Sequence, residues 1–134
     1  MAISLLVDKK NELKYKDLVG VVKKGKAFST QKSVHLVAAV IALKLKFEPK
    51  KVSNRHEIIR YTNLSSKEQK VMKYIALSCA KDPFVLADQE KIVDIVNGLA
   101  NAGFPTLYEA IYQSGGDHIY KLIEYCQKHF WRNK

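Results

Sequence analysis

The chain has 134 residues, and its 23 Lys and Arg residues outnumber its 13 Asp and Glu residues to give a net charge of +10. A hydrophobic fraction of 47% is too high for a disordered polypeptide, and the length suits one domain spanning residues 1–134. The longest apolar run, residues 36–43, is far shorter than the ~20 residues that a membrane-spanning helix requires. The first residues also lack the positive region of a secretory signal. We therefore expect a cytoplasmic protein with reduced cysteines and no membrane contact.

The positive charge is concentrated in the first half of the chain. Residues 1–75 contain 17 Lys or Arg and 6 Asp or Glu, whereas residues 76–134 contain 6 and 7. This asymmetry predicts one strongly positive face, which attracts polyanions. Lys outnumbers Arg 20 to 3, and Arg is the usual residue for reading bases. The pattern favours contact with a nucleic-acid backbone over sequence-specific recognition; the alternative is a lysine-rich surface that only maintains solubility.

The N-terminal half is predicted to centre on one buried helix. The segment from Leu5 to Lys24 mixes apolar residues with lysines and predicts one helix or two short ones. After a Ser29-Thr30 N-cap, residues 34–47 carry apolar residues on two helical stripes, which is typical of a central, buried helix. Pro49 ends this helix. Residues 57–62 are rich in β-branched and aromatic side chains and predict a short strand.

Caps and breakers divide the second half into further helices. Residues 65–68 form a capping box for a helix that ends near Lys81 and buries five residues of its apolar stripe: Val71, Met72, Ile75, Ala76 and Cys79. Asp82-Pro83 begins a short turn, and a helix follows from about residue 88 to 102, with Gly103 as its left-handed C-terminal residue. Pro105 begins another short helix, and Asp117 caps the last one. The expected fold is mostly α, a single compact domain of five to seven helices with at most a short strand near residues 57–62.

The sequence shows no pattern typical of catalysis or metal binding. The four histidines are scattered, and neither Cys-x-x-Cys nor His-Glu-x-x-His spacing occurs. Cys79 and Cys126 lie on apolar helical stripes, where a thiol acts as a small hydrophobe. No nucleophile elbow or phosphate-binding loop is present, and the acidic residues of segment 88–94 are better explained as an exposed helix face. We expect no enzyme, no metal and no cofactor.

Two sets of residues are candidates for binding. The first set is basic, clusters before and after the central helix, and is interspersed with neutral donors that suit phosphate contacts: Lys23, Lys24, Lys26, Lys32, Lys44, Lys46, Lys50, Lys51, Arg55, Arg60, Lys67, Lys70 and Lys73. The second set is aromatic and lies near the C-terminus, where Tyr120, Tyr125 and Trp131 would form a partner or self-association surface. Core filling is the alternative for these aromatics.

Three stretches together resemble a known family. They are residues 26–34 leading into the Ala-rich helix, residues 75–86 with their Asp82-Pro83 turn, and residues 95–104 ending in Gly103-Phe104. In this order they resemble a small accessory family encoded with DNA phosphorothioation (Dnd) systems, which are bacterial sulfur-modification and restriction loci. The resemblance covers about residues 20–125. The chain has Ala102-Gly103 where that family tends to have Gly-Gly.

The resemblance implies a genomic context and transfers no catalytic residue. Together with the basic half, it predicts a non-catalytic, DNA-associated module of an anti-phage defence system that contacts duplex DNA without sequence specificity, other proteins of a defence complex, or both. The alternative is a protein–protein adaptor or inhibitor whose basic face binds an acidic partner. A nuclease subunit with an unrecognised site is a third interpretation, and self-association stays open.

Overall fold

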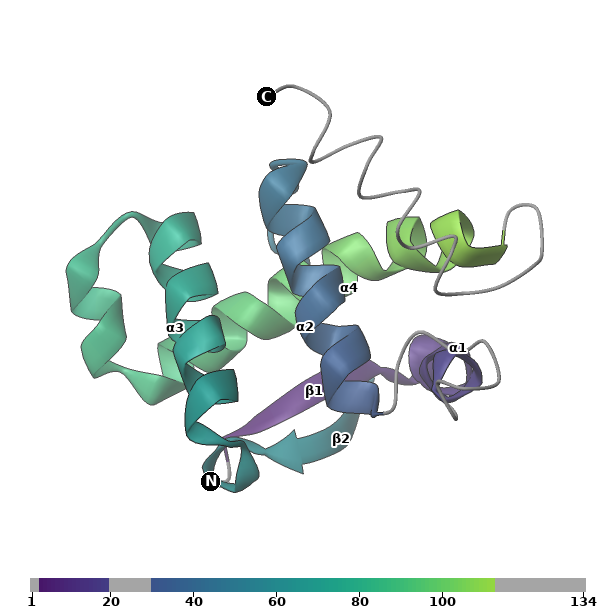
Figure 1. Cartoon of the computed structure of the whole chain (residues 1–134), viewed down its shortest axis with the longest axis horizontal. Helices are drawn as coiled ribbons and strands as arrows, with labels where there is room; N and C mark the ends of the chain where they lie inside the picture. The colour runs from purple at the N-terminus through teal and green to yellow at the C-terminus, as the bar shows by residue number, and fades with distance from the viewer. Residues whose placement is uncertain (1–2, 20–29, 113–134) are drawn as a thin grey trace.

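The computed structural model describes residues 3–19 and 30–112 of the chain. Its elements follow in the order β1 (Ser4–Asp8), α1 (Lys9–Leu18), α2 (Gln31–Lys44), β2 (Arg55–Arg60), a 3-10 helix η2 (Tyr61–Asn63), α3 (Ser66–Ala80), a 3-10 helix η3 (Pro83–Ala87) and α4 (Gln89–Tyr112). The long α4 runs behind α2 and α3, and the two-stranded sheet lies near the N-terminal ends of α2 and α3 (Figure 1). The mostly α fold is as expected.

Four α-helices are present in the described part of the chain, which is fewer than the predicted five to seven. The main reason is that the two helices predicted between residues 88 and 113 form one helix, α4, with Pro105 in its interior. The helix predicted after Asp117 lies outside the described residues. Phe104 and Leu107, on either side of Pro105, are both buried, and this packing outweighs one lost backbone hydrogen bond.

Gly103 is not the helix terminus that its position suggested. It lies within α4 and is buried where α4 crosses α2. A Cβ atom at Gly103 would lie 2.1 Å from the carbonyl oxygen of Ala38 and 3.1 Å from the Cβ of Ala42. The glycine is needed for the close approach of two backbones, and the fully buried alanines of α2 provide the other side of this contact.

The expected strand exists, and its partner is a segment that was predicted to be helical. β1 pairs with β2 in antiparallel orientation, with a register irregularity between Leu5 and Leu6. The helix begins only at Lys9, where the Asp8 side chain accepts a hydrogen bond from the Lys10 amide. Leu5 and Val7 are buried. An apolar run this short does not separate strand from helix by period alone, and the pairing with β2 decides its conformation.

Helix α2 is the central helix that the two apolar stripes predicted, but it ends at Lys44, three residues earlier than expected. Its N-cap is Thr30, as predicted, and Ile41 is only 1% exposed. The end is a Schellman motif: the amides of Lys46 and Phe47 donate to the carbonyls of Leu43 and Ala42 at 3.2 and 2.8 Å. Phe47 therefore leaves the stripe to which the sequence assigned it and is partly exposed.

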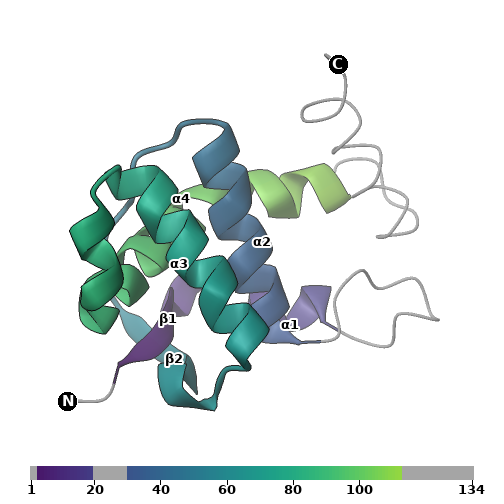
Figure 2. The ribbon, with the colours of Figure 1, turned by 60° about the vertical axis from the view of Figure 1, so that its left-hand side comes forward.

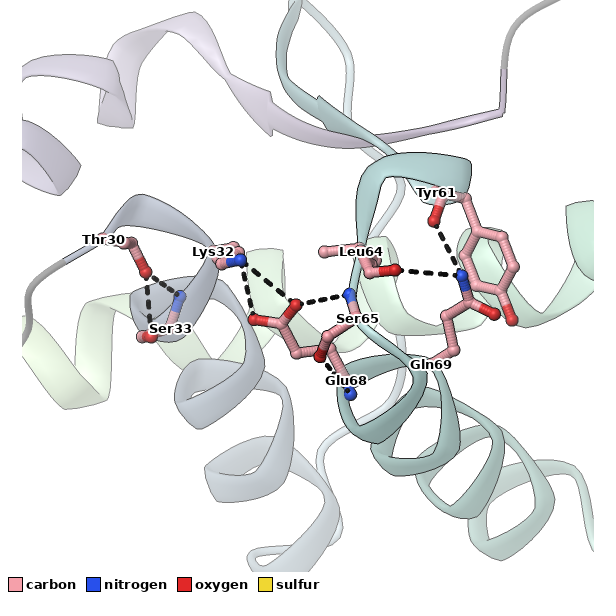
Figure 3. Close-up of polar contacts among 8 residues, drawn as sticks. All are labelled: Thr30, Lys32, Ser33, Tyr61, Leu64, Ser65, Glu68 and Gln69. Carbon is pink, nitrogen blue, oxygen red and sulfur yellow. Dashed lines mark hydrogen bonds and ion pairs between the residues drawn. The ribbon is translucent and has the colours of Figure 1, made fainter.

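The capping box of α3 is confirmed, and it also ties α3 to α2. The Glu68 amide donates to the Ser65 hydroxyl, and the Glu68 carboxylate accepts from the Ser65 amide at 2.8 Å. The same carboxylate lies 3.0 Å from the ammonium group of Lys32 on α2 (Figure 3). Of the α3 stripe, Met72, Ile75 and Ala76 are buried and Cys79 is partly so.

Val71 was predicted to be buried with the rest of the α3 stripe, but its side chain is 42% exposed. The Asp82-Pro83 cap is confirmed at the start of η3. Among the described residues, no helix combines the length and the apolar character needed to cross a bilayer.

Candidate functional site: a basic loop and an adjacent groove

A buried polar relay connects α1, α2, α4 and β1. The Tyr15 hydroxyl lies 2.9 Å from Nδ1 of His35, and Nε2 of His35 lies 2.8 Å from Oδ1 of Asn97. Asn97 also occupies the free edge of β1, since it accepts from the Leu6 amide at 3.0 Å and donates to the Ser4 carbonyl at 3.1 Å. Because Oδ1 of Asn97 only accepts, Nε2 of His35 carries the proton and Nδ1 accepts from Tyr15.

The chemistry of this relay is structural. Burial lowers the pKa of His35 from 6.5 to about 4, although its hydrogen bond to Asn97 acts in the opposite direction. The imidazole is therefore neutral at physiological pH, and both ring nitrogens have partners inside the core. Tyr15 and His35 are each about 1% exposed, so no substrate has access to them. Sequence reasoning missed the relay because its members are distant in sequence.

A concentration of exposed positive charge follows α2. We define the basic loop as residues 44–55, which connect the last residue of α2 to the first residue of β2. It carries five exposed cations, with Glu48 as its one acidic residue: Lys44, Lys46, Lys50, Lys51 and Arg55. Among the described residues, none of these five forms an ion pair within 4.0 Å. Their charge is therefore available to an external anion.

The backbone of the basic loop is held in place along its length. The Lys50 amide donates to the Gly98 carbonyl of α4 at 2.9 Å, and the Asn101 side chain donates to the carbonyls of Lys50 and Lys51 at 3.0 and 3.3 Å. Val52 is buried, and the Ser53 hydroxyl donates to the Asp8 carboxylate at 3.0 Å. Loop side chains on a fixed backbone lose less conformational entropy on binding than those of a loose loop.

The other basic candidates lie elsewhere. Lys67, Lys70 and Lys73 are exposed on α3, and Arg60 is exposed at the end of β2. Lys32 is paired with Glu68, so its charge is already balanced. Lys23, Lys24 and Lys26, and the aromatic candidates Tyr120, Tyr125 and Trp131, lie outside the described residues.

A groove of about 770 Å³ opens beside the basic loop. We call it the α2–α3 groove, because the C-terminal parts of both helices form its walls while Leu99 of α4 contributes to its floor. Its apolar lining includes Val40, Leu43, Phe47, Val71 and Ile75. Figure 2 shows α3 beside α2 with α4 behind them. A groove of this size is in the range of ligand-binding clefts.

Three lysines lie around this groove, and two of them have a left-handed backbone conformation. Lys44, Lys46 and Lys81 are exposed at the groove. Lys46 and Lys81 follow the ends of α2 and α3 with φ of 61° and 57°, the left-handed conformation that usually favours glycine. Lysine near a helix C-terminus interacts favourably with the helix dipole. Sequence reasoning missed Lys81, because it belongs to the near-neutral half of the chain and reaches the basic loop only through folding.

No cluster of three or more His, Cys, Asp or Glu side chains that could hold a metal ion occurs within residues 3–19 and 30–112. Cys79 lines the α2–α3 groove as a free thiol, and burial raises its pKa. The thiolate fraction at neutral pH is correspondingly low. The described residues therefore offer exposed cations and an apolar groove, which are suited to binding.

The family model for DNA sulphur modification system-associated protein 4 matches residues 7–131. The chain belongs to this family. The match confirms the resemblance seen in the three sequence stretches, and it extends that resemblance toward both ends of the chain. The family is associated with DNA sulphur modification systems, and its description names no activity, ligand or partner. No curated protein and no solved structure matches the chain.

Proposed function

We propose that this protein is a non-catalytic accessory component of a DNA sulphur modification system, and that it binds the phosphate backbone of duplex DNA through the basic loop. The proposal rests mainly on the basic loop, whose backbone is hydrogen-bonded to α4. This loop carries five exposed cations, and none of them forms an ion pair with another described residue. We also propose that the protein acts in an anti-phage defence complex. Membership in a family associated with DNA sulphur modification systems supports this part of the proposal.

The composition of the basic loop favours phosphate contact over base recognition. Four of its five cations are lysines, which act as point charges toward phosphate, whereas bidentate recognition of guanine is mainly the work of arginine. Asn54 is exposed between Lys51 and Arg55 and supplies a neutral donor. Such contacts position a protein on a duplex and carry no sequence information.

Fluorescence anisotropy with labelled duplexes of two unrelated sequences tests the proposal. Counterion release makes log affinity fall linearly with log salt, with a slope of about −0.9 per phosphate contact. A surface that engages four to six phosphates should lose roughly two to three decades of affinity between 50 and 200 mM salt. Both sequences should bind equally well. Absence of binding at ~20 mM salt would overturn the proposal.

A further inference from the structure

Three of the large apolar side chains that are exposed among the described residues lie together at the α2–α3 groove, whereas Leu13, Phe84 and Leu86 do not line it. Tyr74 is 67% exposed, Val71 42% and Phe47 37%, and all three line the groove. Val71 and Tyr74 belong to α3 and Phe47 follows the end of α2, so the uncovered residues come from both walls of the groove. A contiguous apolar surface with a polar rim is typical of an interaction site.

The charges at the rim restrict what the groove accepts. Lys44, Lys46 and Lys81 line it together with one carboxylate, that of Glu48. A cationic occupant would be repelled, whereas Asp and Glu side chains flanking an apolar stripe would match both the rim and the lining. Duplex DNA fits this groove less well than the basic loop, because its outer surface is dominated by charged phosphates and offers few apolar groups to cover Phe47, Val71 and Tyr74.

The elements around the groove also restrict the backbone of the occupant. Its lining comes from α2, α3, α4 and residues 46–49 of the basic loop, and the β1–β2 sheet does not contribute to it. An extended peptide would find no strand edge with which to pair its backbone. A helix satisfies its own backbone hydrogen bonds, and helix-in-groove binding needs only side-chain contacts.

We infer that the α2–α3 groove binds an acidic, amphipathic helix of a partner protein, with apolar side chains in the groove and carboxylates against Lys44, Lys46 and Lys81. This inference goes beyond the proposed DNA contact and does not depend on it. Lys44 and Lys46 belong to both surfaces, whereas Lys50, Lys51 and Arg55 do not line the groove and remain available to DNA when a helix is bound, so one protein would connect a nucleic acid to a protein partner.

A designed peptide provides the probe. It has about 18 residues, with Leu at positions i, i+3, i+4 and i+7 of a helical stripe and Glu on both flanks. One control peptide has the same composition in scrambled order, and another carries Lys in place of Glu. We expect the acidic amphipathic peptide to bind with a Kd below ~100 μM, and each control peptide to bind at least tenfold more weakly. The amide shifts of the labelled protein should change at Leu43, Phe47, Val71, Tyr74 and Ser78.

Two variants and one control separate this site from the DNA surface. Tyr74→Ala should weaken peptide binding at least tenfold and leave DNA affinity within twofold, while Leu13→Ala, at an equally exposed apolar position on α1 (77% exposed), should change neither. The double variant Lys50→Glu/Lys51→Glu should weaken DNA binding and leave peptide affinity within threefold.

Several results would overturn the inference. These are absence of peptide binding at 100 μM, equal binding of the scrambled peptide, or amide shift changes outside the groove. Equal loss of DNA and peptide binding in Tyr74→Ala would instead make the groove part of the DNA surface, and the protein partner would be rejected. Folding of each variant is verified by its circular dichroism spectrum, so a lost signal is not confused with unfolding.

Discussion

His35 on α2 donates a hydrogen bond to Asn97 on α4 across 2.8 Å, and the same Asn97 carboxamide occupies the free edge of β1. The Asn97 side chain thus fixes the positions of α2, α4 and the β1–β2 sheet relative to one another. Each polar group of the relay has a partner, which is the condition for a buried network to specify a structure. Because the basic loop is bonded to the next turn of α4 through Asn101, the relay also determines where the loop lies.

Replacement of Asn97 with alanine should strongly destabilise the protein. The substitution leaves the His35 Nε2–H, the Leu6 amide and the Ser4 carbonyl without their partner, and each buried unpaired group costs about 1–3 kcal/mol. We expect a loss of at least ~3 kcal/mol in the free energy of unfolding, measured by urea denaturation. Asn101→Ala is the matched control on the same helix. It frees only carbonyls of the exposed basic loop, which water can bind, and a loss of about 1 kcal/mol should result. Equal losses in the two variants would contradict this assignment.

The buried imidazole predicts a pH dependence of stability. The pKa of His35 is about 4 in the folded protein and 6.5 in a free side chain. Between these values the unfolded chain binds the additional proton, so the free energy of unfolding falls as the pH falls from 6.5 toward 4. The loss should be on the order of 3 kcal/mol at pH 4, and about 2 kcal/mol should be lost by pH 5. Carboxylates contribute mainly below this window.

Urea denaturation at pH 5 and pH 7 checks this pH effect. His35→Gln should flatten the dependence, whereas His56→Gln, at a surface position beside Glu12, should retain it. Nitrogen chemical shifts provide a second measurement, because the His35 ring should keep its Nε2–H tautomer at pH 5. A ring that titrates near pH 6.5 would refute the neutral, buried relay.

The close contact at Gly103 predicts that its replacement with alanine lowers the free energy of unfolding, which is opposite to the usual effect of this substitution within a helix. Within a helix this change normally stabilises by up to about 1 kcal/mol. Here the new Cβ would lie 2.1 Å from the Ala38 carbonyl oxygen, so α2 and α4 must separate. Gly103→Ala should therefore lower the free energy of unfolding by at least ~2 kcal/mol. Gly98→Ala is the comparison and should cost less, because its Cβ would come closest to a side-chain atom, the Pro49 Cβ at 2.7 Å, and no nearer than 3.3 Å to backbone. A Gly103→Ala variant as stable as the wild type would show that this crossing is loose.

Local signals predicted much of this fold, and long-range contacts account for what they missed. Thr30, the Ser65–Glu68 box and Asp82-Pro83 act on backbone groups within a few residues, so their caps were readable from the sequence. The conformation of residues 4–8 depends on pairing with β2, and the role of Gly103 depends on α2. Both contacts join residues at least 47 positions apart in the sequence.

The candidate site was only partly predictable, for the same reason. The cations of the basic loop lie within twelve residues of sequence, and their common exposure followed from charge patterning. Lys81 and Tyr74 reach the α2–α3 groove because α3 packs beside α2. No local pattern shows that Lys81 shares a surface with Lys44 and Lys46, since Lys81 lies at the end of α3 and the other two lie at the end of α2.

The burial of Ile41 in the central helix predicts a much larger loss of stability on substitution than at an exposed position. Ile41 is 1% exposed and belongs to the hydrophobic core. Ile41→Ala should lower the free energy of unfolding by about 2–5 kcal/mol, because it removes buried methylene groups and leaves a cavity. Leu13→Ala on the exposed side of α1 should change it by less than ~0.5 kcal/mol. A loss below ~1 kcal/mol at Ile41, measured by urea denaturation, would show that α2 is not the core helix.

Charge reversal in the basic loop should weaken DNA binding equally for all sequences. Lys50→Glu/Lys51→Glu removes two exposed cations, and each lost phosphate contact lowers the magnitude of the salt slope by about 0.9. We expect a slope reduced by about 2 and an affinity at least tenfold lower at 100 mM salt, measured by fluorescence anisotropy on two unrelated duplexes. Lys10→Glu/Lys91→Glu changes the net charge by the same amount at exposed positions outside the loop. If this control loses as much affinity as the loop variant, the protein responds to total charge and the basic loop is not the DNA-binding surface.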